Sequence, residues 1–345
     1  MDAVLDLDAG TLERLVVEAG GRPFHARSIR DWIVRRGVFD LGAMTDLPRA
    51  LVGGLAGNVA PLSTTVVERA RSADGTVKLL VGLEDGERIE TVVIPGKEGA
   101  TLCVSTQVGC PVGCRFCASG IAGVVRNLRA SEIVEQFLHG RAEAAAGPLG
   151  HLSRAVIMGI GEPLLNADNL LEALALVTDP EGLGLGTRRV TISTIGHPDR
   201  IRALAARGRP YPLAVSLHAP DDETRARLVP SMAKIPIADI LAAARDYFES
   251  TGREVTFEYV LLGGVNDAPE HAQALARLLA GTRSTVNLIP WNRVAEFDFD
   301  PPAPGAPERF ASVLRAAGIP ATIRWSRGAD AAAACGQLRI DRARK

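Results

Sequence analysis

From about residue 101 onward, short apolar runs alternate with longer stretches in which apolar side chains recur every three or four positions. The short runs have the length and composition of buried strands, and the longer stretches have the period of amphipathic helices. A repeated strand and helix unit predicts a parallel sheet, and six units predict an α/β fold with an incomplete (β/α)6 barrel. The predicted strands are residues 101–105, 155–158, 190–193, 213–217, 255–261 and 285–289.

The chain before this repeat has a different pattern. Residues 11–19, 26–36 and 45–55 have helical periodicity and predict three short helices. Two apolar runs flank Asp85-Gly86 and predict a β-hairpin over residues 78–94. We therefore divide the chain into four parts: an N-terminal helical accessory domain (1–60), a β-hairpin extension (61–97), the partial barrel (98–326) and a C-terminal tail (327–345).

Arginine is concentrated in the N-terminal helical part, although the whole chain of 345 residues has a formal net charge of only -1. A local excess of cations can bind the phosphates of a nucleic acid, which predicts RNA binding by this part. A solvated helix face is the alternative that the pattern leaves open. The arginines are Arg22, Arg27, Arg30, Arg35 and Arg36, and they are accompanied by one acid, Asp31.

The composition, with 47% hydrophobic residues, is that of a globular protein with a large core. The first residues lack a basic segment followed by an apolar one, and no run of about eighteen apolar residues occurs. We therefore expect a cytoplasmic protein with no membrane partner.

Three of the five cysteines lie within eight residues, in the spacing Cys110-x3-Cys114-x2-Cys117 just after the first predicted strand. Clustered cysteines outside a disulfide framework indicate metal binding. A four-iron cluster normally has four thiolate ligands, so three thiolates would leave one iron open to another ligand. The alternative is a zinc site completed by His139 or His151, but this spacing followed by a barrel pattern argues against it.

Residues 103–117, with the sequence CVSTQVGCPVGCRFC, closely resemble the RlmN and Cfr family of RNA adenosine methyltransferases, which are radical S-adenosylmethionine (SAM) enzymes. Further matches follow in the family's order: MGIGEPL (158–164), SLHA (216–219), FEY (257–259), NLIP (287–290) and ACGQL (334–338). The resemblance runs from about residue 23 to residue 338. It implies a radical SAM barrel, a 4Fe-4S cluster on Cys110, Cys114 and Cys117, and the use of two SAM molecules per turnover.

The resemblance also implies a set of residues that bind SAM. Each of them falls at or just beyond the carboxyl end of a predicted strand, where barrel enzymes build their sites. Carboxylate and hydroxyl groups can pair with the amine and ribose of SAM, and amides can bind its adenine. These residues are Gly161, Glu162, Ser193, Ser216, Leu217, His218 and Asn292.

The two remaining cysteines and one glutamate receive catalytic roles from the same resemblance. Cys335 would accept a methyl group from one SAM molecule, and a second SAM would supply the radical that removes a hydrogen from the methylated thiol. The resulting carbon would add to adenine, and Cys103 would then attack the Cys335 sulfur and form a transient disulfide. Glu90 stands at the family's position of the proton acceptor. Whether Glu90 or Cys103 removes the proton of adenine carbon 2 stays open.

The substrates that the resemblance implies are the adenosine of the peptidyl transferase centre in 23S rRNA and the adenosine next to the tRNA anticodon. A low-potential cluster also needs an electron donor, for which a flavodoxin-like protein is suited. The sequence departs from the family at residues 327–331 and at Trp291, and neither departure falls on one of the residues above.

Several alternatives remain at this point. Methylation at carbon 8, as in the Cfr branch, is one, although Pro163 resembles the RlmN branch. An iron-sulfur or zinc module that binds RNA without catalysis is another. Cys103 as a buried core residue, Cys335 as an incidental thiol and Glu90 as a solvent-facing strand residue are the structural alternatives to the catalytic roles.

Overall fold

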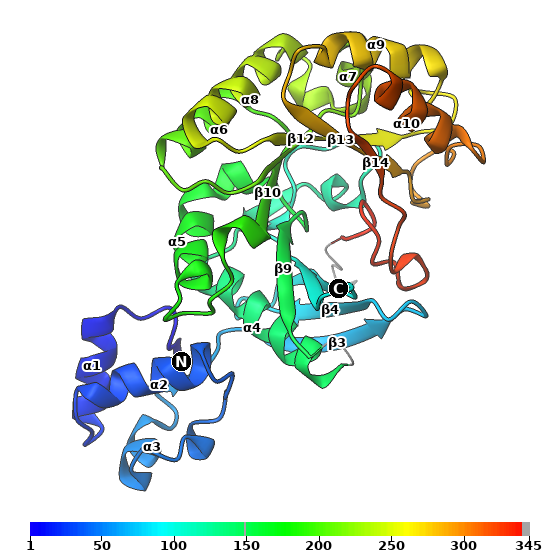
Figure 1. Cartoon of the computed structure of the whole chain (residues 1–345). Helices are drawn as coiled ribbons and strands as arrows, with labels where there is room; N and C mark the ends of the chain where they lie inside the picture. Colours follow the sequence, from blue (N-terminus) through cyan, green and yellow to red (C-terminus); the bar gives the residue numbers. More distant parts are fainter. Residues whose placement is uncertain (148–149, 340–345) are drawn as a thin grey trace.

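The computed structural model describes residues 1–147 and 150–339, and one large twisted sheet of ten strands dominates this part of the chain (Figure 1). The strands, in their spatial order, are β14 (Ala321–Ile323), β13 (Ser284–Pro290), β12 (Val255–Leu261), β11 (Leu213–Ser216), β10 (Val190–Thr194), β9 (Leu152–Ile157), β6 (Ala100–Cys103), β5 (Arg88–Ile94), β4 (Val77–Gly82) and β3 (Thr65–Arg71).

The strands from β6 to β14 pair in parallel, and amphipathic helices connect them. The expected α/β fold with an incomplete barrel is thus confirmed, but the sheet has a seventh parallel strand, β14, that the sequence did not predict. None of the helices in the described residues is long and apolar enough to cross a lipid bilayer. The helices are α4 (Ala130–Ala146), α5 (Ala167–Thr178), α6 (Pro198–Ala206), α7 (Asp222–Leu228), α8 (Ile237–Thr251), α9 (Pro269–Leu279) and α10 (Ala306–Ala316).

Strands β3, β4 and β5 continue the same sheet in antiparallel pairing beyond β6. The predicted hairpin is formed by β4 and β5, and its turn contains Gly86 with a φ of 86°. The third strand, β3, was not predicted. It is the outermost strand, and its register with β4 shifts between Val66 and Glu68.

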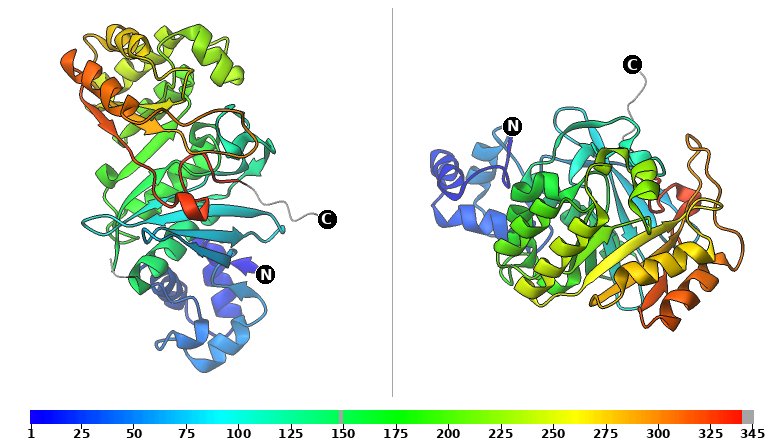
Figure 2. Two further views of the ribbon diagram at one scale, coloured as in Figure 1. Left: turned by 90° about the vertical axis from the view of Figure 1, so that its right-hand side faces the viewer. Right: turned by 90° about the horizontal axis from the view of Figure 1, so that it is seen from above.

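The N-terminal residues form helices α1 (Ala9–Glu18), α2 (Phe24–Val34) and α3 (Arg49–Leu55), with a small parallel sheet of β1 (Asp2–Ala3) and β2 (Val59–Ala60). These helices lie together at one end of the molecule, away from β12 to β14 (Figures 1 and 2). Leu12, Ile29 and Leu51, one from each helix, are fully buried. The three predicted helices are therefore present and share a core.

The arginines of this part are not the free row of cations that the sequence suggested. Arg30 is partly buried and donates to backbone carbonyl oxygens of the segment before α1. Arg35 and Arg36 both form ion pairs with Asp31, at 3.4 and 2.9 Å. Among the described residues, Arg27 has no such side-chain partner. Most of these guanidinium groups thus stabilise the fold, because each is held by an oxygen of the same chain.

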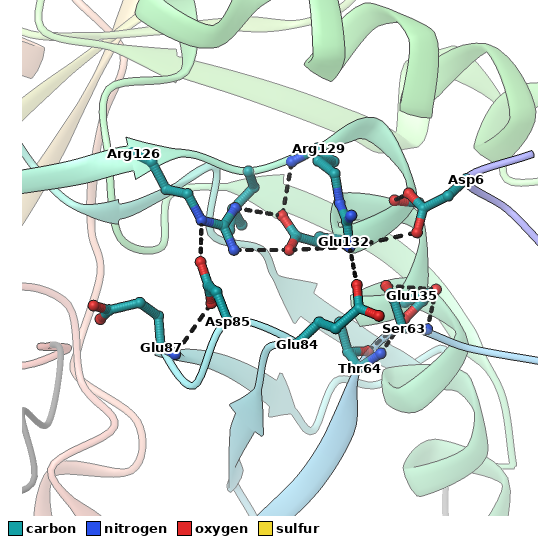
Figure 3. Close-up of polar contacts among 12 residues, drawn as sticks. Asp6, Ser63, Thr64, Glu84, Asp85, Glu87, Arg126, Arg129, Glu132 and Glu135 are labelled. Carbon is teal, nitrogen blue, oxygen red and sulfur yellow. Dashed lines mark hydrogen bonds and ion pairs between the residues drawn. The ribbon is translucent and has the colours of Figure 1, made fainter. Parts of the chain in front are cut away.

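A polar junction, shown in Figure 3, joins four segments of the molecule. Arg126, on β8 (Val124–Asn127), pairs with Asp85 in the β4–β5 turn at 2.6 Å and with Glu132 of α4 at 2.8 Å. Arg129 pairs with Asp6 of the N-terminal segment at 3.4 Å. Glu132 is 1% exposed, so its carboxylate depends on these cations.

Candidate active site

A cavity of about 260 Å³ lies at the carboxyl ends of the parallel strands. All five cysteines of the chain line it, together with most of the residues predicted to bind SAM. Its position agrees with the rule that barrel enzymes build their sites at this end of the strands. The predicted site residues that line the cavity are Cys103, Cys110, Cys114, Cys117, Gly161, Glu162, Ser193, Ser216, His218, Asn292 and Cys335.

The loop that carries Cys110, Cys114 and Cys117 is shaped by contacts of the protein itself. It follows β7 (Gln107–Gly109) and packs on a separate cluster of buried apolar side chains. The backbone N–H of Arg115 donates to the Leu228 carbonyl oxygen at 2.9 Å, and Trp291 Nε1 donates to the carbonyl oxygen of Phe116 at 2.9 Å. The loop is therefore preorganised to hold its ligands.

Burial raises the pKa of all three loop thiols, that of Cys110 to about 12. Cys117 and Cys110 raise the pKa of Cys114 further, because their negative charges would repel that of Cys114. The three thiols therefore become thiolates together only when a cation compensates their charge. A cluster of iron ions supplies such a charge. Three thiols around a shared cavity thus fit a 4Fe-4S cluster.

The zinc alternative does not fit this geometry. Neither His139 nor His151 is among the residues that line the cavity. His139 instead contacts Thr64 Oγ1 at 2.9 Å. In the described ranges, no group of three or more histidine, cysteine, aspartate or glutamate side chains is arranged to hold a single metal ion.

Gly161 and Glu162 form a fixed turn at the end of β9. Gly161 has a φ of 112°, and a Cβ at this position would lie 2.8 Å from atoms of two neighbouring side chains, so only glycine fits. The buried Glu162 carboxylate accepts hydrogen bonds from Thr194 Oγ1 and from the Ile195 N–H, both at 2.7 Å. Burial raises the pKa of Glu162. The carboxylate therefore holds the end of β10 in place, and the turn borders the cavity.

The other predicted SAM ligands come from the ends of β10, β11 and β13. Ser193, Ser216 and Asn292 each face the cavity. His218 has a left-handed backbone with a φ of 61°, and its Nδ1 accepts a hydrogen bond from a backbone N–H of β12 at 3.1 Å. Burial lowers the pKa of His218 to about 3, so its ring is neutral. The side chain of Leu217 is fully buried in the main core and does not line the cavity.

Cys103 of β6 and Cys335 of the C-terminal tail line the same cavity, although they lie far apart in the sequence. Cys103 is the last residue of β6 and is 8% exposed, whereas Cys335 is exposed. Burial raises the pKa of Cys103 to about 12, and the charge of Cys335 acts in the same direction. Surrounding protein atoms raise the pKa of Cys335 to about 11. Both thiols border the same cavity, and the charge of Cys335 acts on Cys103.

The tail that carries Cys335 is docked against the loop of the three thiols. The Ala118 N–H donates to the Gly336 carbonyl oxygen at 2.8 Å, and Asn292 Nδ2 donates to the carbonyl oxygen of Cys335 at 3.0 Å. The end of the predicted tail, residues 340–345, lies outside the described residues. The described part of the tail thus forms one wall of the cavity.

Glu90 lies outside the cavity. Its carboxylate is 2.7 Å from Lys78 Nζ and accepts a hydrogen bond from the Arg339 N–H at 2.9 Å. Lys78 Nζ also donates to the carbonyl oxygen of Ala332 at 3.1 Å. Glu90 is only 6% exposed, because the tail covers it. In this arrangement Glu90 holds the tail, and the carboxylate is not in contact with the space where a substrate would lie.

The lining residues that were not predicted include Arg324, Trp325 and Glu258. Arg324 and Trp325 follow β14, and the positive charge of Arg324 opposes the upward shifts in the pKa of Cys103 and Cys335. Glu258 of β12 has a pKa raised by burial, and its Oε2 has no hydrogen-bond partner within the described residues. The rule of strand ends would have indicated Arg324 and Trp325 if the three-residue strand β14 had been recognised.

The parallel partial barrel and the loop of three thiols at its open end define a radical SAM enzyme. The model of the Radical SAM superfamily matches residues 104–278. A second family model, of the ribosomal RNA large subunit methyltransferase N-terminal domain, matches residues 3–59.

Relatives and a solved structure agree over almost the whole chain. A probable dual-specificity RNA methyltransferase RlmN from Symbiobacterium thermophilum is 46% identical over 96% of this chain and 89% of its own length. The relative of the same name from Rhodopirellula baltica is 44% identical over 98% of this chain and 91% of its own. The crystal structure of a radical SAM methyltransferase from Sphaerobacter thermophilus matches with a TM-score of 0.91 and 43% identity, over 98% of this chain and 99% of that one. The chain belongs to the RlmN family of radical SAM RNA methyltransferases. It is a SAM-dependent RNA methyltransferase whose cofactors are a 4Fe-4S cluster and SAM.

Proposed function

We propose that the enzyme methylates carbon 2 of adenosine, in the peptidyl transferase centre of 23S rRNA and next to the tRNA anticodon. The observation that carries this proposal is the convergence of all five cysteines on one cavity. Three belong to the loop that holds the cluster. The remaining two, Cys103 and Cys335, line the same cavity and are free thiols, which a two-thiol methyl transfer requires.

Adenine carbon 2 lies between two ring nitrogens, so it is electron-poor and does not attack a methyl sulfonium as a nucleophile. When bound, the cluster and SAM supply a methyl group and radical chemistry. Cys335 is suited to carry the methyl group because it lies on the docked tail and lines the cavity. Its thiolate attacks the methyl carbon, and a carbon–sulfur bond forms on the protein as the bond to SAM breaks.

The methylated carrier would then lose one hydrogen atom to the radical that SAM supplies, and its carbon would join carbon 2 of the base. The adduct would return one electron to the cluster and give up the carbon 2 proton to a base of the protein, which leaves Cys335 covalently linked to RNA. Cys103 releases the product by attacking the Cys335 sulfur: a disulfide forms, and the carbon–sulfur bond to the RNA breaks with its electron pair left on carbon. The methyl group is completed by a proton, and cellular thiols reduce the disulfide.

A second group must remove the proton of carbon 2. Cys103 lines the cavity and Glu90 does not, which supports Cys103 for this step in the docked arrangement. Glu90 would take part only after the tail that covers it has moved, because its carboxylate accepts from Lys78 and from the Arg339 N–H. Glu90 thus has two roles in this proposal: it holds the docked tail, and it can accept a proton after the tail has moved.

The rim of the cavity suits a base that has been turned out of an RNA strand. Trp325 is 60% exposed and lines the cavity, between Arg324 and residues 326–327, which also line it. An exposed aromatic ring beside arginines can stack on a base and neutralise phosphates. We assign a low-potential protein of the flavodoxin class as the electron donor, because reduction of such clusters needs one.

The experiment that tests the site of methylation uses RNA labelled with deuterium at carbon 2 or at carbon 8 of the target adenosine. Fragments of 23S rRNA and tRNA are incubated with the reconstituted enzyme, SAM and a chemical reductant, and the nucleosides are analysed by mass spectrometry. We expect methylated adenosine that has lost deuterium from carbon 2 and kept it at carbon 8. Loss of the label from carbon 8 would assign the enzyme to the carbon 8 reaction instead.

A further inference from the structure

Arg225 is a buried arginine whose side chain is only partly hydrogen bonded. It lies on α7 and is 1% exposed. Its Nη2 donates to the carbonyl oxygen of Ile195 at 2.6 Å and contacts that of Ser216 at 3.4 Å, at the ends of β10 and β11. Its Nε and Nη1 are buried and have no partner in the part of the chain that the structure describes. Two donors of this cation are therefore left for another group.

The carboxylate of Asp222 favours the charged form of Arg225 but forms no ion pair with it. Oδ1 of Asp222 instead accepts the Ile237 N–H at 2.7 Å. Across the described ranges, no carboxylate forms an ion pair with Arg225. Burial lowers the pKa of the guanidinium to about 10, so it remains a cation at neutral pH. A buried cation with no ion-pair partner is costly, and the cost is removed when an anion lies near it.

The loop that carries Cys110, Cys114 and Cys117, here called the thiol loop, is the segment that would bring an anionic iron-sulfur cluster close to Arg225. The three loop cysteines pack on an apolar cluster that contains Leu228 of α7, one turn along the helix from Arg225. The loop rests on α7 through the hydrogen bond from the Arg115 N–H to the Leu228 carbonyl oxygen. Arg225 itself is not among the residues that line the cavity. It lies next to the cavity, because it donates to the carbonyl oxygen of Ile195, which does line the cavity.

We propose that Arg225 is the internal counter-cation of the iron-sulfur cluster, and that its charge raises the reduction potential of the cluster. The net charge of a cluster, the hydrogen bonds to its sulfurs and its exposure determine the potential. A buried positive charge on the helix against which the thiol loop packs favours the reduced form, which carries one more negative charge. The inference rests on the assignment of the cluster to the three loop cysteines and is independent of which adenine carbon receives the methyl group.

The test is a redox titration of the reconstituted cluster in the absence of SAM and RNA, followed by electron paramagnetic resonance. In Arg225→Gln, we expect the ratio of reduced to oxidised cluster at a fixed applied potential to fall at least tenfold, which is about 59 mV for a one-electron step. Arg225→Lys keeps the charge and should stay close to the parent protein. Arg141→Gln is the matched control, because Arg141 also donates to backbone carbonyl oxygens, but its partners are Ile33 and Arg35 of the N-terminal part and not the strand ends beside the cavity.

The outcomes separate charge from shape. An Arg225→Gln protein with the parent's potential would overturn the proposal, and so would an Arg225→Lys protein displaced as far as Arg225→Gln. If Arg225→Gln folds but binds no iron, the iron content of Arg225→Lys shows whether the positive charge is what cluster binding requires. Retained iron in that variant supports a charge requirement, whereas loss of iron in both, with normal iron in Arg141→Gln, contradicts it. None of these measurements depends on methyl transfer, so they remain interpretable if the proposed function fails.

Discussion

The side-chain amide of Asn292 donates a hydrogen bond to the backbone carbonyl oxygen of Cys335 at 3.0 Å. This bond connects the loop after β13 to the C-terminal tail, and the Ala118 N–H contributes a second connection through Gly336. The barrel and the thiol loop together therefore position Cys335. The catalytic cavity is consequently complete only when the tail is docked.

Replacing any of Cys110, Cys114 or Cys117 by alanine should abolish binding of the cluster. The other two cysteines that line the cavity belong to β6 and to the tail, so neither can take the place of a ligand on the loop. We expect loss of the brown absorbance and of the bound iron after reconstitution, with the circular dichroism of the folded protein retained. Cys103→Ala is the control and should bind iron like the parent. Full iron content in any of the three loop variants would remove the assignment.

Cys335→Ala and Cys103→Ala should fail in different ways. Without Cys335 there is no methyl carrier, so that variant should be inactive and free of RNA. Without Cys103 the carrier can still join the base, but no thiolate is left to break the adduct. Protein crosslinked to RNA should accumulate, and mass spectrometry after nuclease digestion should place a nucleotide on Cys335 through one added carbon. Normal turnover by Cys103→Ala would mean that the two-thiol mechanism is wrong.

Trp325→Ala should weaken RNA binding by roughly tenfold or more, since stacking of a base on an aromatic ring contributes about 1–3 kcal/mol. Trp325→Phe should keep most of the affinity because it keeps an aromatic face. Val67→Ala is a suitable control, as Val67 is 52% exposed but lies on β3, outside the cavity. Fluorescence anisotropy with a labelled RNA stem-loop measures the three affinities. Equal affinities for Trp325→Ala and Val67→Ala would show that the ring does not contact RNA.

Arg126→Ala should destabilise the protein by about 3 kcal/mol, because it leaves the buried Glu132 carboxylate with less compensation. Arg207→Ala removes an exposed ion pair with Asp168 and should cause little change. Urea unfolding followed by circular dichroism compares the two variants with the parent protein. A similar stability of both variants would show that the junction in Figure 3 contributes little.

The burial of His139 should make the free energy of unfolding decrease in acid. Burial lowers its pKa from 6.5 to about 4, so the folded protein resists the protonation that the unfolded chain accepts. The stability from neutral His139 is complete above pH 6.5 and is lost as the pH falls toward 4, at up to about 1.4 kcal/mol per pH unit. Urea unfolding across this window should show a slope that His139→Gln reduces. An unchanged slope in that variant would exclude His139 as the cause.

The periodic part of the chain was predictable because its apolar runs are long and uniform. The predicted strand over residues 255–261 coincides with β12, in which nearly all side chains are buried. Strand β14 escaped prediction because three residues carry too little pattern. Strand β3 escaped because its side chains are all exposed or only partly buried, so that no buried apolar face marks it.

The site was predictable wherever a residue acts through its local motif. The three loop cysteines and Gly161 are of this kind, and the structure brings them to the cavity. Glu90 was placed on its strand, but no local pattern shows that Arg339, far along the chain, covers its carboxylate. Arg225 stands in the sequence DETRARL, which has the pattern of a solvated helix. Arg225 is buried against the ends of β10 and β11, where it contacts the carbonyl oxygens of Ile195 and Ser216, and these contacts cannot be inferred from the helix alone.

The outermost strand β3 has a consequence for how the protein behaves at high concentration. An unpaired strand edge is a template on which another chain can add and begin an aggregate. The irregular register between Val66 and Glu68 interrupts such a template, and Arg69 and Arg71 add charges that are held in place by Glu143 at 3.1 and 2.6 Å. An incomplete barrel leaves its sheet open, and the charged and irregular edge allows it to stay open without polymerising.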